Sequence, residues 1–166
     1  MNVLCIIPAR GGSRRLPSKN ILPVAGKPLL AYSIEQALYA SSVDKVVVST
    51  DDLEIASIAK SYGADVIDRP LELATDTATS ESALMHGLEE VEKEGFHPDL
   101  IVFLQCTSPI RRPNDIDGAI EMIGSSDADS LFSATDSRWL IWRRDQNGLL
   151  PVNYDYTNRQ REQIMP

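Results

Sequence analysis

Short apolar runs and amphipathic stretches alternate along most of this chain. Apolar runs rich in β-branched residues predict buried strands at residues 3–7, 45–49, 64–67, 100–104 and 130–134. Apolar residues at helical spacing predict helices over residues 28–40, over a segment that contains Ile55 and ends near Gly63, and over residues 80–94 and 114–123. This alternation predicts an α/β fold in which a mostly parallel sheet carries helices on both faces.

Several residues mark where these helices begin. Pro28 suits the first position of the first helix, and Ser80 and Asn114 are placed to cap the third and fourth. Asp51 and Asp52 precede the second helix. They suit either a metal ion or a helix cap, and the sequence favours the cap.

The pattern changes character after residue 137. Two apolar runs, residues 140–143 and 149–152, flank the dipeptide Asn147-Gly148, which is a strong signal for a β-hairpin. The chain is therefore predicted to consist of an α/β core over residues 1–137 and a hairpin appendage over residues 138–166 that belongs to the same domain. Trp139 and Trp142 are expected to bury against the core or a subunit interface.

The loop after the first strand carries the clearest candidate chemistry. Gly11 and Gly12 permit a sharp turn whose amides are free to face a ligand, and four cations lie close by at Arg10, Arg14, Arg15 and Lys19. The first 34 residues contain five Lys or Arg and no Asp or Glu, although the chain has a net charge of −8. This local charge predicts a polyphosphate site, with a solvated basic turn as the alternative. The spacing matches neither a Walker loop nor a dinucleotide-binding fingerprint.

Two further polar loops follow the third and fourth predicted strands, at residues 69–80 and 105–111. Ligands of parallel α/β sheets bind beyond the carboxyl ends of the strands. We therefore expect these two loops and the glycine loop, residues 10–20, to form one cleft.

Composition narrows the possible partners. A chain of 166 residues with 43% apolar content fits one globular domain, and its apolar runs are too short to span a membrane. The acidic balance argues against nucleic acid. The chain opens without a secretory leader, and its two cysteines and two histidines lack zinc spacing, so a cytoplasmic protein is expected.

Five motifs, in order along nearly the whole chain, resemble the cytidylyltransferases that activate sialic acids, and the last of them resembles the acylneuraminate branch. They are Ile7–Ser13 with Pro17, Lys19 and Asn20; Ser49–Asp52; Arg69-Pro70 with Asp76–Ser80; Gln105-x-Thr107-Ser108-Pro109-x-Arg111; and Asn153–Tyr156 with Asn158-Arg159. The resemblance implies a Rossmann-like nucleotidyltransferase sheet. It also implies transfer of CMP from CTP to a nine-carbon keto-acid sugar, with release of pyrophosphate.

The resemblance also implies a role for each matching residue. Arg10 and Lys19 would be catalytic, because they would stabilise the departing pyrophosphate. The sugar would face Gln105, Thr107, Ser108 and Arg161. The nucleotide would contact Ala9, Arg10, Gly11, Gly12, Ser13, Lys19, Asn20, Arg69, Ala78 and Ser80. Two of these assignments have structural alternatives, since Arg69 would also suit a brace for an extended loop and the residues after Gln105 would also suit a plain turn.

Some features depart from the family pattern. Cys106 and the pair Arg15-Leu16 replace commoner residues, and Glu162 and Ile164 alter a C-terminal element. Family members continue into a strand and an Asp-x-Asp segment that binds Mg²⁺, so the resemblance implies Mg²⁺ as cofactor, a C-terminally shortened chain and ligands that this sequence does not identify. It further implies a homodimer formed through residues 140–152. A CTP-binding module without turnover and a transferase for a deoxy-octulosonate acceptor stay open as alternatives, as does the identity of the nine-carbon acceptor.

Overall fold

The computed structural model describes residues 1–13, 16–134, 141–146, 148–153, 155 and 157. The chain forms two compact units, Met1–Asp129 and Ser130–Pro166. The first unit contains the sheet and its helices, and the second contains a hairpin. The division after residue 137 predicted from the sequence stays a prediction.

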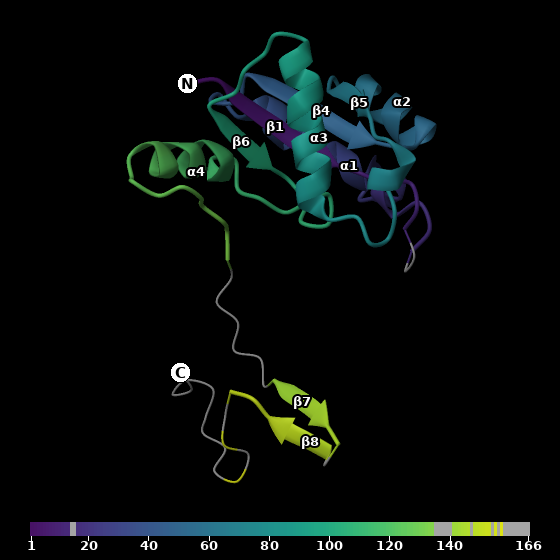
Figure 1. The fold of residues 1–166 in the computed structure, drawn as a ribbon, viewed down its shortest axis with the longest axis vertical. Coiled ribbons are helices and arrows are strands. Elements are labelled where there is room, and N and C mark those ends of the chain that lie inside the picture. Colours follow the sequence, from purple (N-terminus) through teal and green to yellow (C-terminus); the bar gives the residue numbers. More distant parts are fainter. Residues whose placement is uncertain (14–15, 135–140, 147, 154, 156, 158–166) are drawn as a thin grey trace. The chain divides into compact units, whose positions relative to one another are not determined.

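A four-stranded parallel sheet forms the centre of the first unit (Figure 1). Its strands are β1 (Val3–Pro8), β4 (Lys45–Thr50), β5 (Asp65–Asp68) and β6 (Leu100–Phe103), in the order β5-β4-β1-β6. The strand order places β1 and β4 in the middle, and β1 is fully buried from Val3 to Ile7. The predicted α/β fold with a mostly parallel sheet is confirmed.

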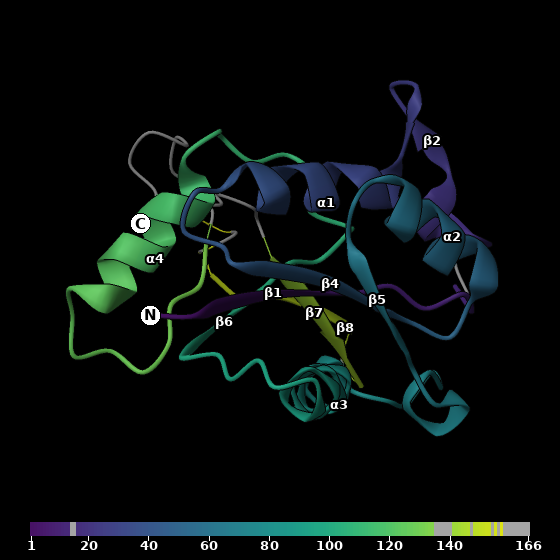
Figure 2. The ribbon, with the colours of Figure 1, turned by 90° about the horizontal axis from the view of Figure 1, so that it is seen from above.

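Helices cover both faces of this sheet (Figure 2). The helices α1 (Leu29–Tyr39) and α2 (Leu53–Ser61) lie on one face, and α3 (Ser80–Lys93) lies on the other. Because neighbouring side chains of a strand point to opposite faces, Cys5 and Ile7 join the core under α1 while Leu4 and Ile6 join the core under α3. The helix α4 (Asp115–Gly124) adds Ile116 and Ile120 to the α1 side.

The predicted fifth strand is wrong. Residues 130–134 adopt no regular structure and pair with no strand in the part of the chain that the structure describes. Leu131 and Phe132 are exposed, at 43% and 85% of their surface. Apolar composition alone does not make a strand, because a strand also requires a neighbour to accept its backbone hydrogen bonds.

Helix ends agree with the sequence only in part. Asp52 caps α2, and its carboxylate accepts hydrogen bonds from the amides of Glu54 and Ile55 at 2.8 and 3.0 Å. Thr79, rather than Ser80, caps α3, because its hydroxyl lies 3.2 Å from the amide of Ser82. Pro28 is the N-cap of α1 rather than its first residue, and the side chain of Asn114 makes no cap bond to α4.

Short elements complete the first unit. They are the 3₁₀ turns η1 (Lys19–Ile21) and η2 (Leu71–Leu73) and the two-residue strands β2 (Pro23–Val24) and β3 (Lys27–Pro28), which form a small antiparallel ribbon. The ribbon turns through Ala25 and Gly26, both with positive φ. None of the helices that the structure describes is long and apolar enough to cross a membrane.

The second unit contains the predicted hairpin. The strands β7 (Trp142–Asp145) and β8 (Gly148–Pro151) are antiparallel, with Asp145 opposite Gly148. Gly148 has φ +123°, a conformation that favours glycine, so the Asn-Gly signal marks this turn correctly. Trp142 is 45% exposed within the chain, and Trp139 lies outside the described residues.

Candidate functional site

The three polar loops that follow β1, β5 and β6 line one cavity of about 550 Å³ at the carboxyl ends of these strands. We call it the strand-end cavity. Nine of the residues predicted to bind nucleotide or sugar line it: Arg10, Ser13, Lys19, Asn20, Arg69, Ala78, Ser80, Gln105 and Thr107. Residues that are up to 97 positions apart in the chain therefore meet in one place, at the edge of the sheet where parallel α/β folds bind ligands.

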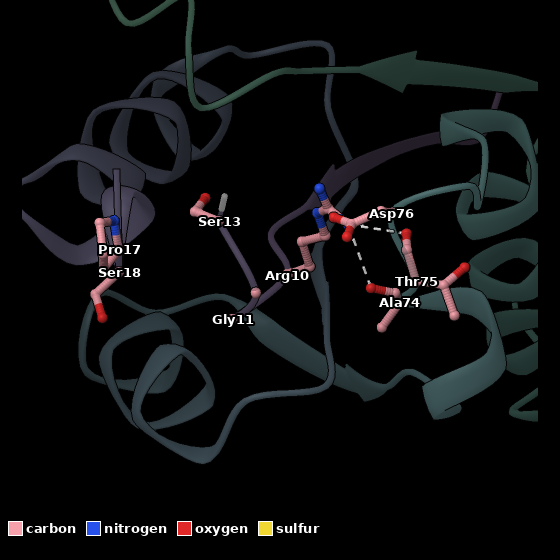
Figure 3. A pocket seen from close by; sticks show the side chains of 9 residues that line it. Arg10, Gly11, Ser13, Pro17, Ser18, Ala74, Thr75 and Asp76 are labelled. Carbon is pink, nitrogen blue, oxygen red and sulfur yellow. Dashed lines mark hydrogen bonds and ion pairs between the residues drawn. The ribbon is translucent and has the colours of Figure 1, made fainter. Parts of the chain in front are cut away.

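A second cavity, of about 470 Å³, adjoins the first at the glycine loop (Figure 3). We call it the glycine-loop cavity. It is lined by Gly11, Gly12, Pro17, Ser18 and Ala74, and it shares Arg10, Ser13, Thr75 and Asp76 with the strand-end cavity. Because they share these four residues, the two cavities have one continuous lining.

The glycine loop is fixed to the start of α2. The Gly11 amide donates a 3.0 Å hydrogen bond to the Asp51 carboxylate, so the expectation that both glycine amides are free is wrong for Gly11. A Cβ added at Gly11 would lie 2.5 Å from Oδ2 and 2.9 Å from Cβ of Asp52, whereas one added at Gly12 would have no neighbour within 4 Å. Gly11 thus serves close packing, and Gly12 faces open space.

Arg10 links the glycine loop to the loop after β5. Its Nη1 lies 2.9 Å from Oδ1 of Asp76 and donates to the carbonyl of Thr75 at 2.8 Å. Figure 3 shows the guanidinium directed toward residues 74–76. Both partners of the ion pair are about one-third exposed, so solvent and an incoming anion can reach them.

Lys19 and Asn20 begin the turn η1 next to Arg10. Asn20 is buried, and its side-chain amide donates to the carbonyl of Arg10 at 3.0 Å, so it holds the loop from inside. Lys19 forms no ion pair with any carboxylate that the structure describes. Ser18, just before it, has φ +52°, which is uncommon for a residue with a side chain and shows that the loop is held in a specific shape.

Arg69 is buried, with 7% of its surface exposed, and lies at the end of β5. Its Nε donates to the Ser49 hydroxyl at 3.0 Å and its Nη2 donates to the Ser49 carbonyl. Burial lowers the pKa of the Arg69 guanidinium, and the nearby Asp51 carboxylate opposes this shift. Arg69 therefore braces two strand ends and also lines the strand-end cavity, so both interpretations from the sequence fit its geometry.

The loop after β6 presents Gln105 and Thr107 on both sides of a buried Cys106. Burial raises the pKa of the Cys106 thiol to about 11, and this outweighs the opposing effect of Arg111, Lys19 and Arg69 nearby. The thiol is therefore protonated at neutral pH, as expected for a packing residue rather than a nucleophile.

Two predicted residues that the structure describes are not brought to these cavities. Ala9 is fully buried and donates its amide to the Ser49 carbonyl at 2.9 Å, and Ser108 lines neither cavity. Arg161 lies outside the described residues. Sequence reasoning missed Thr75 and Asp76 as partners of Arg10, although Asp76 belongs to one of the quoted motifs.

The described residues do not form a metal site. They contain no group of three or more His, Cys, Asp or Glu side chains placed to hold an ion. The nearest carboxylates already have partners, since Asp51 accepts from Gly11, Asp52 caps α2 and Asp76 pairs with Arg10. The Mg²⁺ that the family resemblance implies therefore has no ligand set in the part of the chain that the structure describes.

A comparison with known protein families identifies the family of this chain. The cytidylyltransferase family matches residues 4–155, which include the sheet and the residues that line both cavities. The chain belongs to the cytidylyltransferase family. The predicted resemblance is confirmed at this level.

Curated relatives include three enzymes with different acceptors in their names. The pseudaminic acid cytidylyltransferase of Campylobacter jejuni is 40% identical over 144 residues, which cover 86% of this chain and 62% of that protein. The CMP-N,N'-diacetyllegionaminic acid synthase of Legionella pneumophila is 43% identical over 123 residues, which cover 74% of this chain and 53% of that protein. The N-acylneuraminate cytidylyltransferase of Escherichia coli is 45% identical over 121 residues, which cover 72% of this chain and 28% of that protein. This cytidylyltransferase chain thus spans less than two thirds of each relative.

Solved structures support the fold. A CMP:2-keto-3-deoxy-manno-octonic acid synthetase in complex with CTP has a TM-score of 0.65 and 29% identity, covering 77% of this chain and 49% of its own. A 4-diphosphocytidyl-2C-methyl-D-erythritol synthase has a TM-score of 0.70 at 15% identity, covering 91% and 68%, which shows a shared fold only.

Proposed function

We propose that this cytidylyltransferase transfers CMP from CTP to a nonulosonic acid, a nine-carbon sugar of the sialic, legionaminic or pseudaminic type, and releases pyrophosphate. The observation that carries the proposal is the strand-end cavity, in which three cations and two polar side chains from separate loops meet: Arg10, Lys19, Arg69, Gln105 and Thr107. The names of the relatives support the acceptor class.

The proposed reaction is a direct displacement at the α-phosphorus of CTP. A hydroxyl oxygen of the sugar forms the new bond to the α-phosphorus and releases its proton to solvent, and the bond from that phosphorus to the bridging oxygen of the β-phosphate breaks. Negative charge then accumulates on the departing pyrophosphate. Arg10 and Lys19 would stabilise it, because fixed cations oriented toward developing charge lower such a barrier.

The remaining residues would recognise the substrates. The nucleotide would lie along Ser13 and Asn20, with the base near Arg69, Ala78 and Ser80. The sugar would face Gln105 and Thr107 from the opposite side of the cavity. The backbone of Gly12 would approach the triphosphate, since no neighbour crowds this glycine.

The test measures pyrophosphate release from CTP with Mg²⁺ and each of three nonulosonic acids, N-acetylneuraminic, N,N'-diacetyllegionaminic and pseudaminic acid, and separately with a deoxy-octulosonate. Release with at least one of the three nonulosonic acids supports the proposal, and the one with the highest kcat/KM identifies the substrate. CTP binding without release from any acceptor would refute it and would favour a CTP-binding module. Release only with a deoxy-octulosonate acceptor would favour the alternative suggested by the solved CTP complex.

We also propose that the chain forms a homodimer through its hairpin. The hairpin exposes Ile141, Trp142, Leu149, Leu150 and Val152 to between 41% and 58%. An isolated two-stranded hairpin is at best marginally stable in water, so these side chains require a partner surface. Light scattering of the wild type should give a dimer, and Trp142→Ser should shift it toward monomer. A wild-type monomer would contradict this proposal.

A further inference from the structure

The loop over residues 105–111 carries exposed side chains into the strand-end cavity without secondary structure of its own. Gln105 and Thr107 line the cavity, and both are exposed. Inside the loop, one backbone hydrogen bond joins the Ser108 amide to the Gln105 carbonyl at 3.1 Å. Contacts from outside the loop must therefore fix the position of these side chains.

Such contacts come from the face of α1. The side-chain amide of Gln36 uses both of its ends: Nε2 donates to the Pro109 carbonyl at 2.8 Å, and Oε1 accepts from Nη1 of Arg111 at 2.7 Å. Arg111 then returns to the beginning of the loop, since its Nη2 donates to the Gln105 carbonyl at 3.3 Å, and its Nη1 also reaches the Ser33 hydroxyl at 3.3 Å. One guanidinium and one amide thus hold residues 105, 109 and 111 on one helix.

The surroundings favour a lasting contact. Gln36 and Arg111 are half-buried, and Ser33 is fully buried in α1. Burial lowers the pKa of the Arg111 guanidinium. A half-buried guanidinium keeps its charge and has five donors, so it holds well-placed acceptors firmly.

We propose that Gln36 and Arg111 are positioning residues that hold the loop over residues 105–111, and with it Gln105 and Thr107, in the geometry needed to orient the acceptor. The consequence for catalysis rests on the proposed function, whereas the clamp itself does not. Neither residue lines the strand-end cavity, so each acts through the loop rather than on the substrate.

Two substitutions at Gln36 separate the two halves of the clamp. Gln36→Met keeps the shape of the side chain and removes both hydrogen bonds, whereas Gln36→Glu keeps an acceptor for Arg111 and loses the donor to Pro109. Ile34→Val is the matched control, because Ile34 is fully buried in the same helix and its apolar side chain forms no hydrogen bond with the loop. Its deleted methylene group lowers stability without touching the clamp.

The first measurement does not depend on activity. Within the loop, trypsin can cut after Arg111 but not after Arg112, because Pro113 follows. Loss of the clamp should raise the rate of cleavage after Arg111 by about fivefold or more in Gln36→Met. Gln36→Glu keeps the acceptor for Arg111 but loses the donor to Pro109, so it should give an intermediate rate, and Ile34→Val should stay near the wild-type rate. An unchanged rate in Gln36→Met, or an equal rise in Ile34→Val, would overturn the clamp even if the enzyme is active.

The second measurement tests the consequence for the reaction. Gln36→Met should lower kcat/KM for the acceptor by about tenfold to a hundredfold, as small misplacements of orienting groups do, while the KM for CTP stays within about twofold of wild type. Gln36→Glu should recover most of the loss. Equal losses for both substrates, or no recovery in Gln36→Glu, would overturn the positioning role. If no acceptor supports turnover, the proposed function fails while the trypsin result still decides the clamp.

Discussion

Replacing Gly11 by alanine tests whether close packing against α2 fixes the glycine loop. The added Cβ would lie 2.5 Å from Oδ2 and 2.9 Å from Cβ of Asp52, distances that real Cβ atoms do not show. Asp52 cannot simply rotate away, because its other carboxylate oxygen caps α2 through the amides of Glu54 and Ile55. Either the cap breaks or the loop moves.

The structure sets the magnitude of this effect. Losing an aspartate cap costs about 0.5–2 kcal/mol, and forcing extra atoms into a packed contact costs about 1–3 kcal/mol. Since the protein will take the cheaper combination, we expect Gly11→Ala to lower the free energy of unfolding by about 1–3 kcal/mol. Its Tm should fall by about 3–9 °C for a chain of this size.

Gly12 provides the matched control. A Cβ there meets no atom within 4 Å, and its φ is not in the left-handed region. Replacing a glycine at such a position restricts the unfolded chain, so Gly12→Ala should be neutral or stabilise by up to about 1 kcal/mol. Two neighbouring glycines are thus expected to respond with opposite signs.

A double-mutant cycle locates the cause. Asp52→Gly removes the atoms that the new Cβ would meet and keeps an acceptable cap residue. In that background Gly11→Ala should cost almost nothing, which gives a coupling energy of about 1–3 kcal/mol. Thermal and urea unfolding measure all four proteins. Equal stability of Gly11→Ala and Gly12→Ala, or an additive cycle, would refute the reasoning.

Three further predictions concern the charged and buried groups of the site. Lys19→Met should weaken CTP binding by about tenfold or more in calorimetry, and Arg10→Met should weaken it less. A larger loss at Arg10 would contradict the assignment of Lys19 as the main charged contact to the triphosphate. Arg69→Met should lower the free energy of unfolding by about 1.5–3 kcal/mol, because the Ser49 carbonyl and hydroxyl lose a charged donor, and it should erode the preference for CTP over UTP. An unchanged preference would remove Arg69 from base recognition. Native Cys106 should resist a thiol reagent at pH 8, since its pKa of about 11 keeps the thiol protonated. The free energy of unfolding should fall as pH rises above 9, because the thiol ionises there in the unfolded chain but not in the folded one. Rapid labelling at pH 8 would show instead that the thiol is accessible.

Local patterns were enough to predict the sheet. Each strand of the sheet contains at least two consecutive apolar residues, most of them β-branched, and the four predicted strands that exist agree with the observed bounds to within one residue. The hairpin was also predicted from a local signal, because asparagine and glycine readily adopt the positive φ values that a tight hairpin turn requires. Residues 130–134 have the same apolar character and no partner strand among the described residues, and a pairing partner is not a property of the local sequence.

The site was predictable as a set of loops but not as a set of contacts. The order of strands and helices already implies that the loops after β1, β5 and β6 meet at one edge of the sheet. The pairs that fix these loops are separated by 40 residues for Gly11 and Asp51 and by 75 residues for Gln36 and Arg111. The sequence marked Asp51 only as a candidate cap or metal ligand, and nothing in the local pattern marked Gln36, so only the three-dimensional structure shows these contacts.

The cations of the site differ in the protein groups with which they pair, and this difference predicts how much each contributes to phosphate binding. Arg69 and Arg111 donate to protein oxygens in half-buried or buried surroundings, so they are fixed whether or not a ligand is present. Arg10 pairs with Asp76 at the exposed edge, so a phosphate must take the place of a carboxylate to gain its full interaction. Lys19 has no carboxylate partner among the described residues, so a triphosphate gains its charge without displacing a carboxylate. Lys19 should therefore contribute most to the net binding energy. Arg10 contributes only the difference between its interaction with a phosphate and its interaction with the Asp76 carboxylate, so its substitution is expected to cost less.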